Sequence, residues 1–348
     1  MSLLLSYKKI SSNPLNKARW ETFKGNKRGY FSLWIFTVLF ALSLVGELWI
    51  NDKPIFVSYQ NSWYFPVFED VSENKLGGDF DIITDYKDPY MIKQIENDGF
   101  MIWPLVSFYY DTINYTLDTP APSRPTILNH LGTDDQGRDL LARLVYGFRI
   151  SVLFALTLTL VSSVIGIAIG AVQGYYGGKI DLFGQRLLEI WEGLPMIFML
   201  IILASFVETT FTWLILLMIL FSWPSLVSVV RAEFLRGRNL EYVKAARALG
   251  LPDKTIMFKH ILPNAMIATL TFMPYLFTGA LTTLTSLDFL GFGLPLGSAS
   301  LGEMVAQGKE NLQAPWLAMT AFFALSSILV LLVFIGEAVR DAFDPRNK

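Results

Sequence analysis

The residues of this chain that can carry chemistry are few, and their types exclude most catalytic sites. The 348 residues include no cysteine, so a thiolate nucleophile, a disulfide and a cysteine-ligated zinc site are excluded. The charge pattern places the two histidines, His130 and His260, on opposite sides of a membrane, which argues against a zinc site. We expect no metal and no catalytic residue in this chain.

Glycine and lysine do not combine into a phosphate-binding loop either. Such a loop needs Gly-x-x-x-x-Gly-Lys-Ser/Thr, whose backbone N–H groups cradle the phosphates. The best approach is Gly178-Lys179, but Gln173 stands where the first glycine belongs, and Ile180 follows the lysine. We therefore expect no cofactor on this chain.

A polar, basic segment between two long apolar ones has the clearest local structure. Asn239 is a suitable N-cap, and alanines such as Ala245 favour a helix with little bulk. Gly250 stands where a left-handed C-terminal cap is wanted, Pro252 suits the first turn of a second helix, and Pro263 is expected to end it. The spacing predicts a helix, a sharp turn and a second helix.

Short rigid helices with small side chains can enter a groove on a partner protein. We interpret residues 231–264, called the coupling loop below, as a docking surface on the cytoplasmic side of a membrane. The alternative is an ordinary loop whose charges only fix topology. The residues expected to act in docking are Lys244, Ala245, Ala246, Gly250, His260, Leu262 and Pro263.

The composition is that of a helical membrane protein. Hydrophobic residues make up 53% of the chain and charged residues 17%, against about a quarter in soluble domains. A bilayer core requires about 20 mostly apolar residues per helix. We predict an all-α membrane protein with six transmembrane helices, at Tyr30–Ile50, Ile150–Gln173, Leu187–Val207, Phe211–Val230, Ala265–Thr285 and Trp316–Ile335.

The distribution of Lys and Arg orients the chain. Residues 1–30 hold seven Lys/Arg and one acidic residue, and residues 231–260 hold seven Lys/Arg and three acidic residues. Residues 51–148 hold seven Lys/Arg and 15 acidic residues. Both termini are therefore predicted to be cytoplasmic. The predicted domains are a basic N-terminal segment 1–29, a first transmembrane helix 30–50, a large extracytoplasmic lobe 51–148, a transmembrane domain 149–340 that contains the coupling loop, and a cytoplasmic tail 341–348.

The lobe is rich in aromatic residues and in turn-forming Gly and Pro, which predicts a small folded unit at the outer mouth of the helices. A contact surface for a substrate-delivery protein is the alternative. At its end, charges of alternating sign predict exposed ion pairs that brace the mouth, each contributing about 0–1 kcal/mol. Substrate gating is the alternative role for these residues, which are Asp134, Asp135, Arg138, Asp139, Arg143 and Arg149.

Two features concern the interior of the predicted bundle. Gly166 and Gly170 form a GxxxG pattern, a weak signal for close helix packing. Prolines inside the predicted spans suggest kinks, which neighbouring helices can compensate. The residues that we expect to line a pore, with ordinary core packing as the alternative, are Trp223, Pro224, Met273, Pro274 and Tyr275.

The coupling loop resembles the so-called EAA loop in permease subunits of ATP-binding-cassette importers. The matching positions are Ala245, Ala246, Gly250, Leu262 and Pro263, while Lys244 replaces the leading glutamate of the family. The loss of that acid removes one charge contact and leaves the helix–Gly–helix frame intact.

Two further blocks agree with this resemblance. Residues 131–153 resemble the signature LGTDxxGRDxxSRxxxGxRxSL of dipeptide, oligopeptide and nickel permeases, with Ala142 in place of the usual serine. Residues 288–294 resemble an outer segment of the same family, although Pro295 is not followed by a second proline. The long first loop makes the chain most similar to the Yej-type subgroup, which imports oligopeptides and microcin C.

The resemblance implies a multi-pass permease in the bacterial inner membrane that forms half of a pore for oligopeptides and microcin C-like conjugates. It implies a second homologous permease as heterodimer partner, an ATPase subunit that binds ATP and Mg²⁺ and docks on the coupling loop, and an extracytoplasmic peptide-binding protein. Lipid surrounds the chain, and no nucleic acid is expected as a partner. The alternatives are a permease for metal chelates such as nickel complexes and an ion-coupled transporter that works without ATPases.

Overall fold

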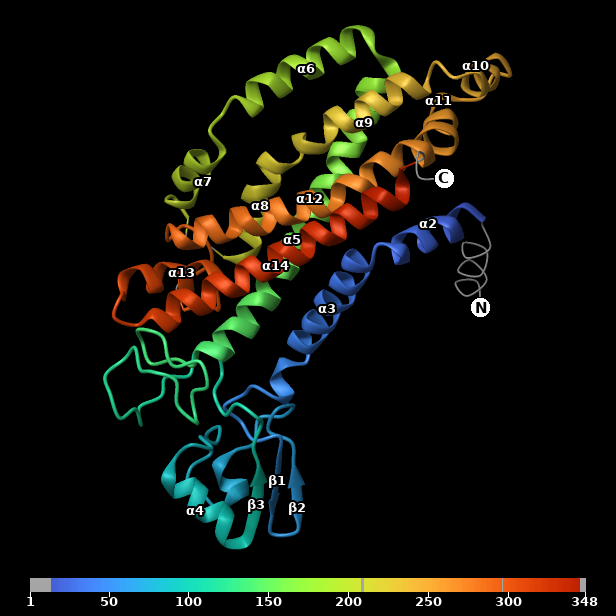
Figure 1. Ribbon diagram of the computed structural model, residues 1–348. Coiled ribbons are helices and arrows are strands. Elements are labelled where there is room, and N and C mark those ends of the chain that lie inside the picture. The colour runs from blue at the N-terminus through green and yellow to red at the C-terminus, as the bar shows by residue number, and fades with distance from the viewer. Residues whose placement is uncertain (1–13, 208–209, 296, 345–348) are drawn as a thin grey trace.

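The computed structural model describes residues 14–207, 210–295 and 297–344 and is mostly helical (Figure 1). A lobe with a small sheet lies at one end of an elongated helical bundle, and α10 and α11 lie at the other end. The bundle and its connections comprise α2 (Pro14–Gly25), α3 (Lys27–Leu44), η1 (Gly46–Leu48), α5 (Leu140–Tyr176), α6 (Gly178–Glu192), α7 (Met196–Ala204), α8 (Phe211–Ser222), α9 (Pro224–Gly237), α10 (Glu241–Ala248), α11 (Asp253–Thr255), η3 (Ile256–Ile261), α12 (Leu262–Phe289), α13 (Leu301–Glu310) and α14 (Pro315–Phe343).

By length and composition, three helices in the described residues can cross a membrane, namely α5, the continuous helix Asp253–Phe289, and α14. The number rises to as many as five if each of two bent helix pairs counts as one span. α6 and α7 are bent by 70° relative to each other, and α8 and α9 by 41°. The first predicted span corresponds to α3, which begins with Lys27 and Arg28 and ends at Leu44 instead of Ile50. The predicted third span is interrupted, because it starts within α6 and crosses the sharper bend.

Proline accounts for the positions of both bends. Pro195 is the extended residue that precedes α7. Pro224 is the first residue of α9 and has no N–H to offer the carbonyl of Leu220, four residues back. That carbonyl instead accepts a hydrogen bond from the indole Nε1 of Trp191 in α6, at 2.9 Å. The bend in the predicted fourth span is therefore compensated by a neighbouring helix, as expected for proline at membrane depth.

Glycines on α5 bring its backbone close to the chain of α8 and α9. A Cβ added at Gly166, Gly170 or Gly174 would lie 2.8, 2.7 or 2.6 Å from a backbone oxygen of the segment 223–231. Real Cβ atoms do not approach that closely, so only glycine permits this contact. The predicted GxxxG packing is confirmed and continues for one more turn, to Gly174.

The lobe contains a three-stranded antiparallel sheet in the order β2-β1-β3, so the all-α prediction is wrong for this part of the chain. Gln60 and Asn61, both with positive φ, join β1 to β2 in a two-residue hairpin turn. The core of the lobe includes Val57, Leu76 and Met91. Its elements are β1 (Phe56–Tyr59), β2 (Ser62–Tyr64), η2 (Glu73–Leu76), α4 (Pro89–Asp98) and β3 (Gly99–Ile102).

The lobe ends earlier than residue 148, because α5 already begins at Leu140. Asp139 caps that helix by accepting a hydrogen bond from the Ala142 N–H at 2.8 Å. Asp139 is itself buried and also accepts from the Asn129 amide at 2.8 Å. Burial raises the pKa of the Asp139 carboxyl above its ordinary value, while these hydrogen bonds oppose that change.

A buried ion-pair network joins the start of α5 to α13. Asp134 contacts Arg138 at 2.6 Å and Arg143 at 3.4 Å, and both arginines also contact Glu303, at 3.3 and 2.9 Å. The side chains of Asp134 and Arg143 are 0% exposed. The bracing role holds, but the expectation of exposed pairs is wrong. Arg149 pairs instead with Glu47, at 2.6 Å.

We expect Gly170→Ala to destabilise the bundle by about 1–3 kcal/mol, because the added methyl group must displace the backbone of α9. The matched control is Gly279→Ala in α12, where an added Cβ meets nothing within 4 Å. Thermal unfolding of both detergent-purified variants measures the difference. Equal stability of the two variants would contradict the close contact between α5 and α9.

We expect Asp134→Asn to cost about 3 kcal/mol, because it leaves Arg138 and Arg143 buried with one remaining acid, Glu303. The control Asp79→Asn removes an exposed carboxylate from the lobe and should be neutral. Melting temperatures in detergent compare the two. A neutral Asp134→Asn variant would mean that the buried arginines do not depend on this charge.

Candidate functional site

α10 ends in a backbone cap that depends on Gly250. This residue has φ of 78°, and its N–H donates to the Arg247 carbonyl at 3.0 Å. The Leu251 N–H donates to the Ala246 carbonyl at 3.2 Å, which completes a Schellman motif. An added Cβ at Gly250 would meet nothing within 4 Å. The predicted left-handed cap is confirmed, and glycine is required there by backbone conformation and not by space.

Two predicted helix ends are wrong. Leu240, not Asn239, occupies the N-cap of α10, and the Asn239 amide donates to the Leu235 carbonyl at the end of α9, at 3.0 Å. Pro263 does not end the second helix, because the chain runs from α11 through the π-helical turn η3 directly into α12. The wider turn accommodates a proline, which offers no N–H to the preceding turn.

The inner face of α10 packs on η3 and on the neighbouring long helices. Val243 and Ala246 are 0% and 5% exposed, and they share a buried cluster with Ile256, Met257 and Ile261. Tyr175 of α5 and Phe234 of α9 belong to the same cluster. Ala246 therefore holds α10 against the bundle and is not available to a partner.

The outer face of α10 carries small and charged side chains. Lys244, Ala245, Ala248 and Gly250 are exposed, and Leu249 is 82% exposed. Leu249 was not predicted, because its spacing from Val243 and Ala246 suggests a third residue of the buried face. The helix ends at Ala248, however, and the cap turns Leu249 outward. We call the exposed residues Lys244, Ala245, Ala248, Leu249 and Gly250 the outer surface of α10.

Polar contacts attach this helix pair to α5. The Tyr175 hydroxyl, near the end of α5, donates to the carboxylate of Asp253 at the start of α11. The guanidinium of Arg247 lies 5.4 Å from the centre of the Tyr175 ring, and the hydrogen bond with Tyr175 raises the pKa of Arg247. Lys244 forms only an exposed pair with Glu241, at 3.1 Å. α10 and α11 therefore have fixed contacts with the long helices of the bundle.

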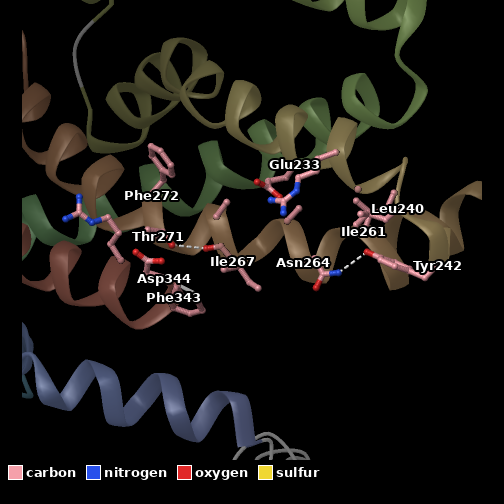
Figure 2. A pocket seen from close by; sticks show the side chains of 15 residues that line it. Glu233, Leu240, Tyr242, Ile261, Asn264, Ile267, Thr271, Phe272, Phe343 and Asp344 are labelled. Atoms are coloured by element: carbon pink, nitrogen blue, oxygen red, sulfur yellow. Dashed lines mark hydrogen bonds between the residues drawn. The ribbon is translucent and has the colours of Figure 1, made fainter. Parts of the chain in front are cut away.

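A cavity of about 560 Å³ lies on the other side of η3, between α9, α12 and the end of α14 (Figure 2). Tyr242 and Asn264 border it, with the Asn264 amide donating to the Tyr242 hydroxyl at 3.0 Å. The Tyr242 hydroxyl in turn donates to the His260 carbonyl at 3.2 Å. The helix pair is thus packed against α5 and α9 on one side and borders open space on the other.

The remaining predicted docking residues lie on the second helix. Pro263 is exposed, while His260 and Leu262 are half-buried. Leu262 packs against the buried cluster under α10. Of the seven predicted residues, four therefore lie in the open, namely Lys244, Ala245, Gly250 and Pro263.

One of the five predicted pore residues lines a cavity within the bundle. Tyr275 lines a cavity of about 200 Å³ within the bundle, whereas the other four do not line it. Trp223 and Pro224 form the break between α8 and α9, and Pro224 is buried. Pro274 lies against α14, since a Cβ at Gly336 would be 3.2 Å from the Pro274 Cβ. Met273 precedes it in α12.

Within the described residues, no group of three or more His, Cys, Asp or Glu side chains could hold a metal ion. α10 and α11 form a helix pair with an exposed surface, which suits contact with another protein.

Comparison with known proteins assigns the class. Residues 163–348, more than half of the chain, match the family model described as "Binding-protein-dependent transport system inner membrane component". The chain belongs to this family and is a permease subunit, a membrane component of a transport system.

Similarity to individual permeases places the chain in a narrower group within this family. The chain is 57% identical over 96% of its length to the Inner membrane ABC transporter permease protein YejE of Escherichia coli K12, 98% of which is covered. It is 53% identical over 96% of its length to the Peptidoglycan transport system permease protein YejE of Agrobacterium fabrum, 94% of which is covered. The Oligopeptide transport system permease protein OppC of Haemophilus influenzae is 32% identical over 69% of this chain and 78% of its own length.

We expect substitutions of Gly250 to destabilise α10 least with Asn, more with Ala and most with Val. Of these three residues, only Asn tolerates positive φ well. Gly250→Val should weaken the cap by about 1–2 kcal/mol. Hydrogen exchange of α10 amides measures this effect. Gly25→Val, at a helical glycine with nothing within 4 Å, is the control. Equal protection in Gly250→Val and Gly250→Asn would refute the strained cap.

Proposed function

We propose that the chain is one half of the membrane pore of an ATP-binding-cassette importer of peptides, driven by an ATPase that docks on the outer surface of α10. The observation that carries this proposal is the exposed, small-residue surface ending at Gly250, held rigidly to α5 and α12. A second, homologous permease would supply the other half of the pore. An extracytoplasmic binding protein would deliver the peptide, and ATP and Mg²⁺ would bind to the ATPase alone.

The orientation of the chain follows from its charges. Residues 231–260 are basic and carry α10, so this end of the bundle is cytoplasmic in our proposal, together with both termini. The lobe, with its excess of acids, then lies outside the bacterial inner membrane. Counting α3 and each bent pair as one span gives six spans. The domains are those set out from the sequence, except that the lobe ends at Asp139.

The mechanism requires that movement of the ATPase reaches the long helices. A force on the outer surface of α10 passes through Val243 and Ala246 to η3, which is continuous with α12. The Tyr175–Asp253 hydrogen bond carries the same force to α5. Closure of the ATPases would thus move α12 and α5 together and change the side of the membrane to which the pore opens. The cavity beside η3 leaves space for that movement.

The peptide substrate is supported by the relatives, which are named for oligopeptide and peptidoglycan transport. Both substrate classes contain a peptide backbone, and a microcin C-like conjugate does as well. Nickel chelates remain the alternative cargo, since the binding protein would select the metal. An ion-coupled transporter is the other alternative, and it predicts uptake that needs a proton gradient instead of ATP.

We expect Leu249→Glu to abolish both co-purification of the ATPase and ATP-dependent uptake, because it places a charge in the contact without disturbing the fold. Leu249 is 82% exposed, so the variant should insert and unfold like the native chain. Leu312→Glu is the matched control, since Leu312 is 81% exposed in the loop that follows α13. α13 lies at the opposite end of the bundle from α10 (Figure 1). Co-purification in mild detergent and uptake into proteoliposomes are the measurements.

Retention of the ATPase and of uptake by Leu249→Glu would contradict docking on α10. Absence of any co-purified ATPase or second permease with the native chain would favour a transporter that acts alone. Loss of ATPase binding in both variants would place the contact elsewhere.

A further inference from the structure

A second cavity lies inside the bundle, halfway along α5, where α8 meets α9. It has a volume of about 200 Å³ and is lined by residues of α5, α7, α8, α9 and α12. None of its described lining residues carries a charge. Apolar side chains such as Met196, Met218 and Phe221 form part of the wall, and the polar part consists of the hydroxyls of Thr159, Ser162, Ser222, Ser225, Tyr275 and Thr283.

The hydroxyls of this cavity fall into two groups. Ser162 and Ser222 donate to carbonyls of their own helices, to Leu158 at 2.5 Å and to Met218 at 2.7 Å. Ser225, Tyr275 and Thr283 make no hydrogen bond within the described part of the chain. The Thr159 hydroxyl also has no partner and is buried, which costs about 1–3 kcal/mol. Ser225 and Tyr275 are exposed and Thr283 is half-buried, so these three hydroxyls are open to water or to a ligand in the cavity.

The helix break beside the cavity does not supply their partners. Pro224 frees the Leu220 carbonyl, but Trp191 of α6 already donates to that oxygen at 2.9 Å. The carbonyl freed at this bend is therefore not left to accept a hydrogen bond from these hydroxyls. Broken helices of this kind line substrate sites in membrane transporters.

We propose that this cavity is a subsite for main-chain amide groups of a peptide in transit, bound by Ser225, Tyr275 and Thr283. This inference rests on the proposed function. A hydroxyl both donates and accepts hydrogen bonds, so the three together match the C=O and N–H groups that every peptide bond repeats. Because no charge lines the cavity, it offers no ion pair to a charged group of the peptide.

The volume of the cavity limits how much of a peptide it can hold. Sites for drug-sized ligands occupy about 300–1,000 Å³. At about 200 Å³, this cavity holds one short stretch of backbone. The rest of a peptide must lie outside it, against the second permease.

The natural absence of cysteine permits a direct test in the assembled transporter. Ser225→Cys and Thr283→Cys should react with a charged, water-soluble methanethiosulfonate reagent, and trialanine under turnover conditions should slow the reaction. Ser163→Cys is the control, because Ser163 is 1% exposed on α5 and does not line the cavity. Labelling no faster than in this control, or labelling that trialanine does not slow, would overturn the proposal.

Transport kinetics provide the second measurement. Tyr275→Phe should raise the KM for trialanine uptake about fivefold, as expected for one lost hydrogen bond, and leave kcat and ATP hydrolysis unchanged. Thr278→Val on the same helix should change neither, since Thr278 bonds the carbonyl of Pro274 and does not line the cavity. If the native transporter shows ATP-dependent uptake and Tyr275→Phe leaves KM unchanged, the subsite is refuted but the proposed function stands. If the native transporter shows no such uptake, the proposed function itself fails.

Discussion

The structure depends on one constraint, which is that lipid offers no hydrogen-bond partner to a peptide group. Wherever a long helix deviates from regular geometry, another part of the chain compensates. The indole of Trp191 takes the carbonyl that Pro224 releases, and the π-turn η3 admits Pro263 without ending the helix. The first of these irregular points is fixed by a side chain of another helix, and the second by a local change of helix geometry. They position both the helix pair at one end and the cavity in the middle.

A second consequence concerns how rigidly the parts are joined. The glycines of α5 bring it against α9, and both helices reach the buried cluster under α10. A contact at that end of the molecule therefore acts on the backbones of two long helices at once. The glycines of α5 permit this packing because a Cβ at these positions would collide with the backbone of the segment 223–231.

Sequence reasoning predicted the features that have local causes. Gly250, flanked by a helix-forming run and a proline, specifies its cap almost alone, and the apolar runs specify α5, α12 and α14. It failed where the cause is distant. The hydrogen bond of Trp191 depends on a tertiary contact, and the exposure of Leu249 depends on the residue at which α10 stops. The sheet in the lobe was missed because its strands have only three or four residues.

The network around Asp134 has a consequence for the order in which the chain is made. Arg138 and Arg143 lie at the start of α5, whereas their second acid, Glu303, follows 165 and 160 residues later. During synthesis, the two guanidinium groups must share a single carboxylate until α13 has emerged and inserted. The mouth of the bundle therefore closes only when α13, in about the last seventh of the chain, arrives. A chain truncated before that point leaves Arg138 and Arg143 with Asp134 as their one shared ion-pair partner.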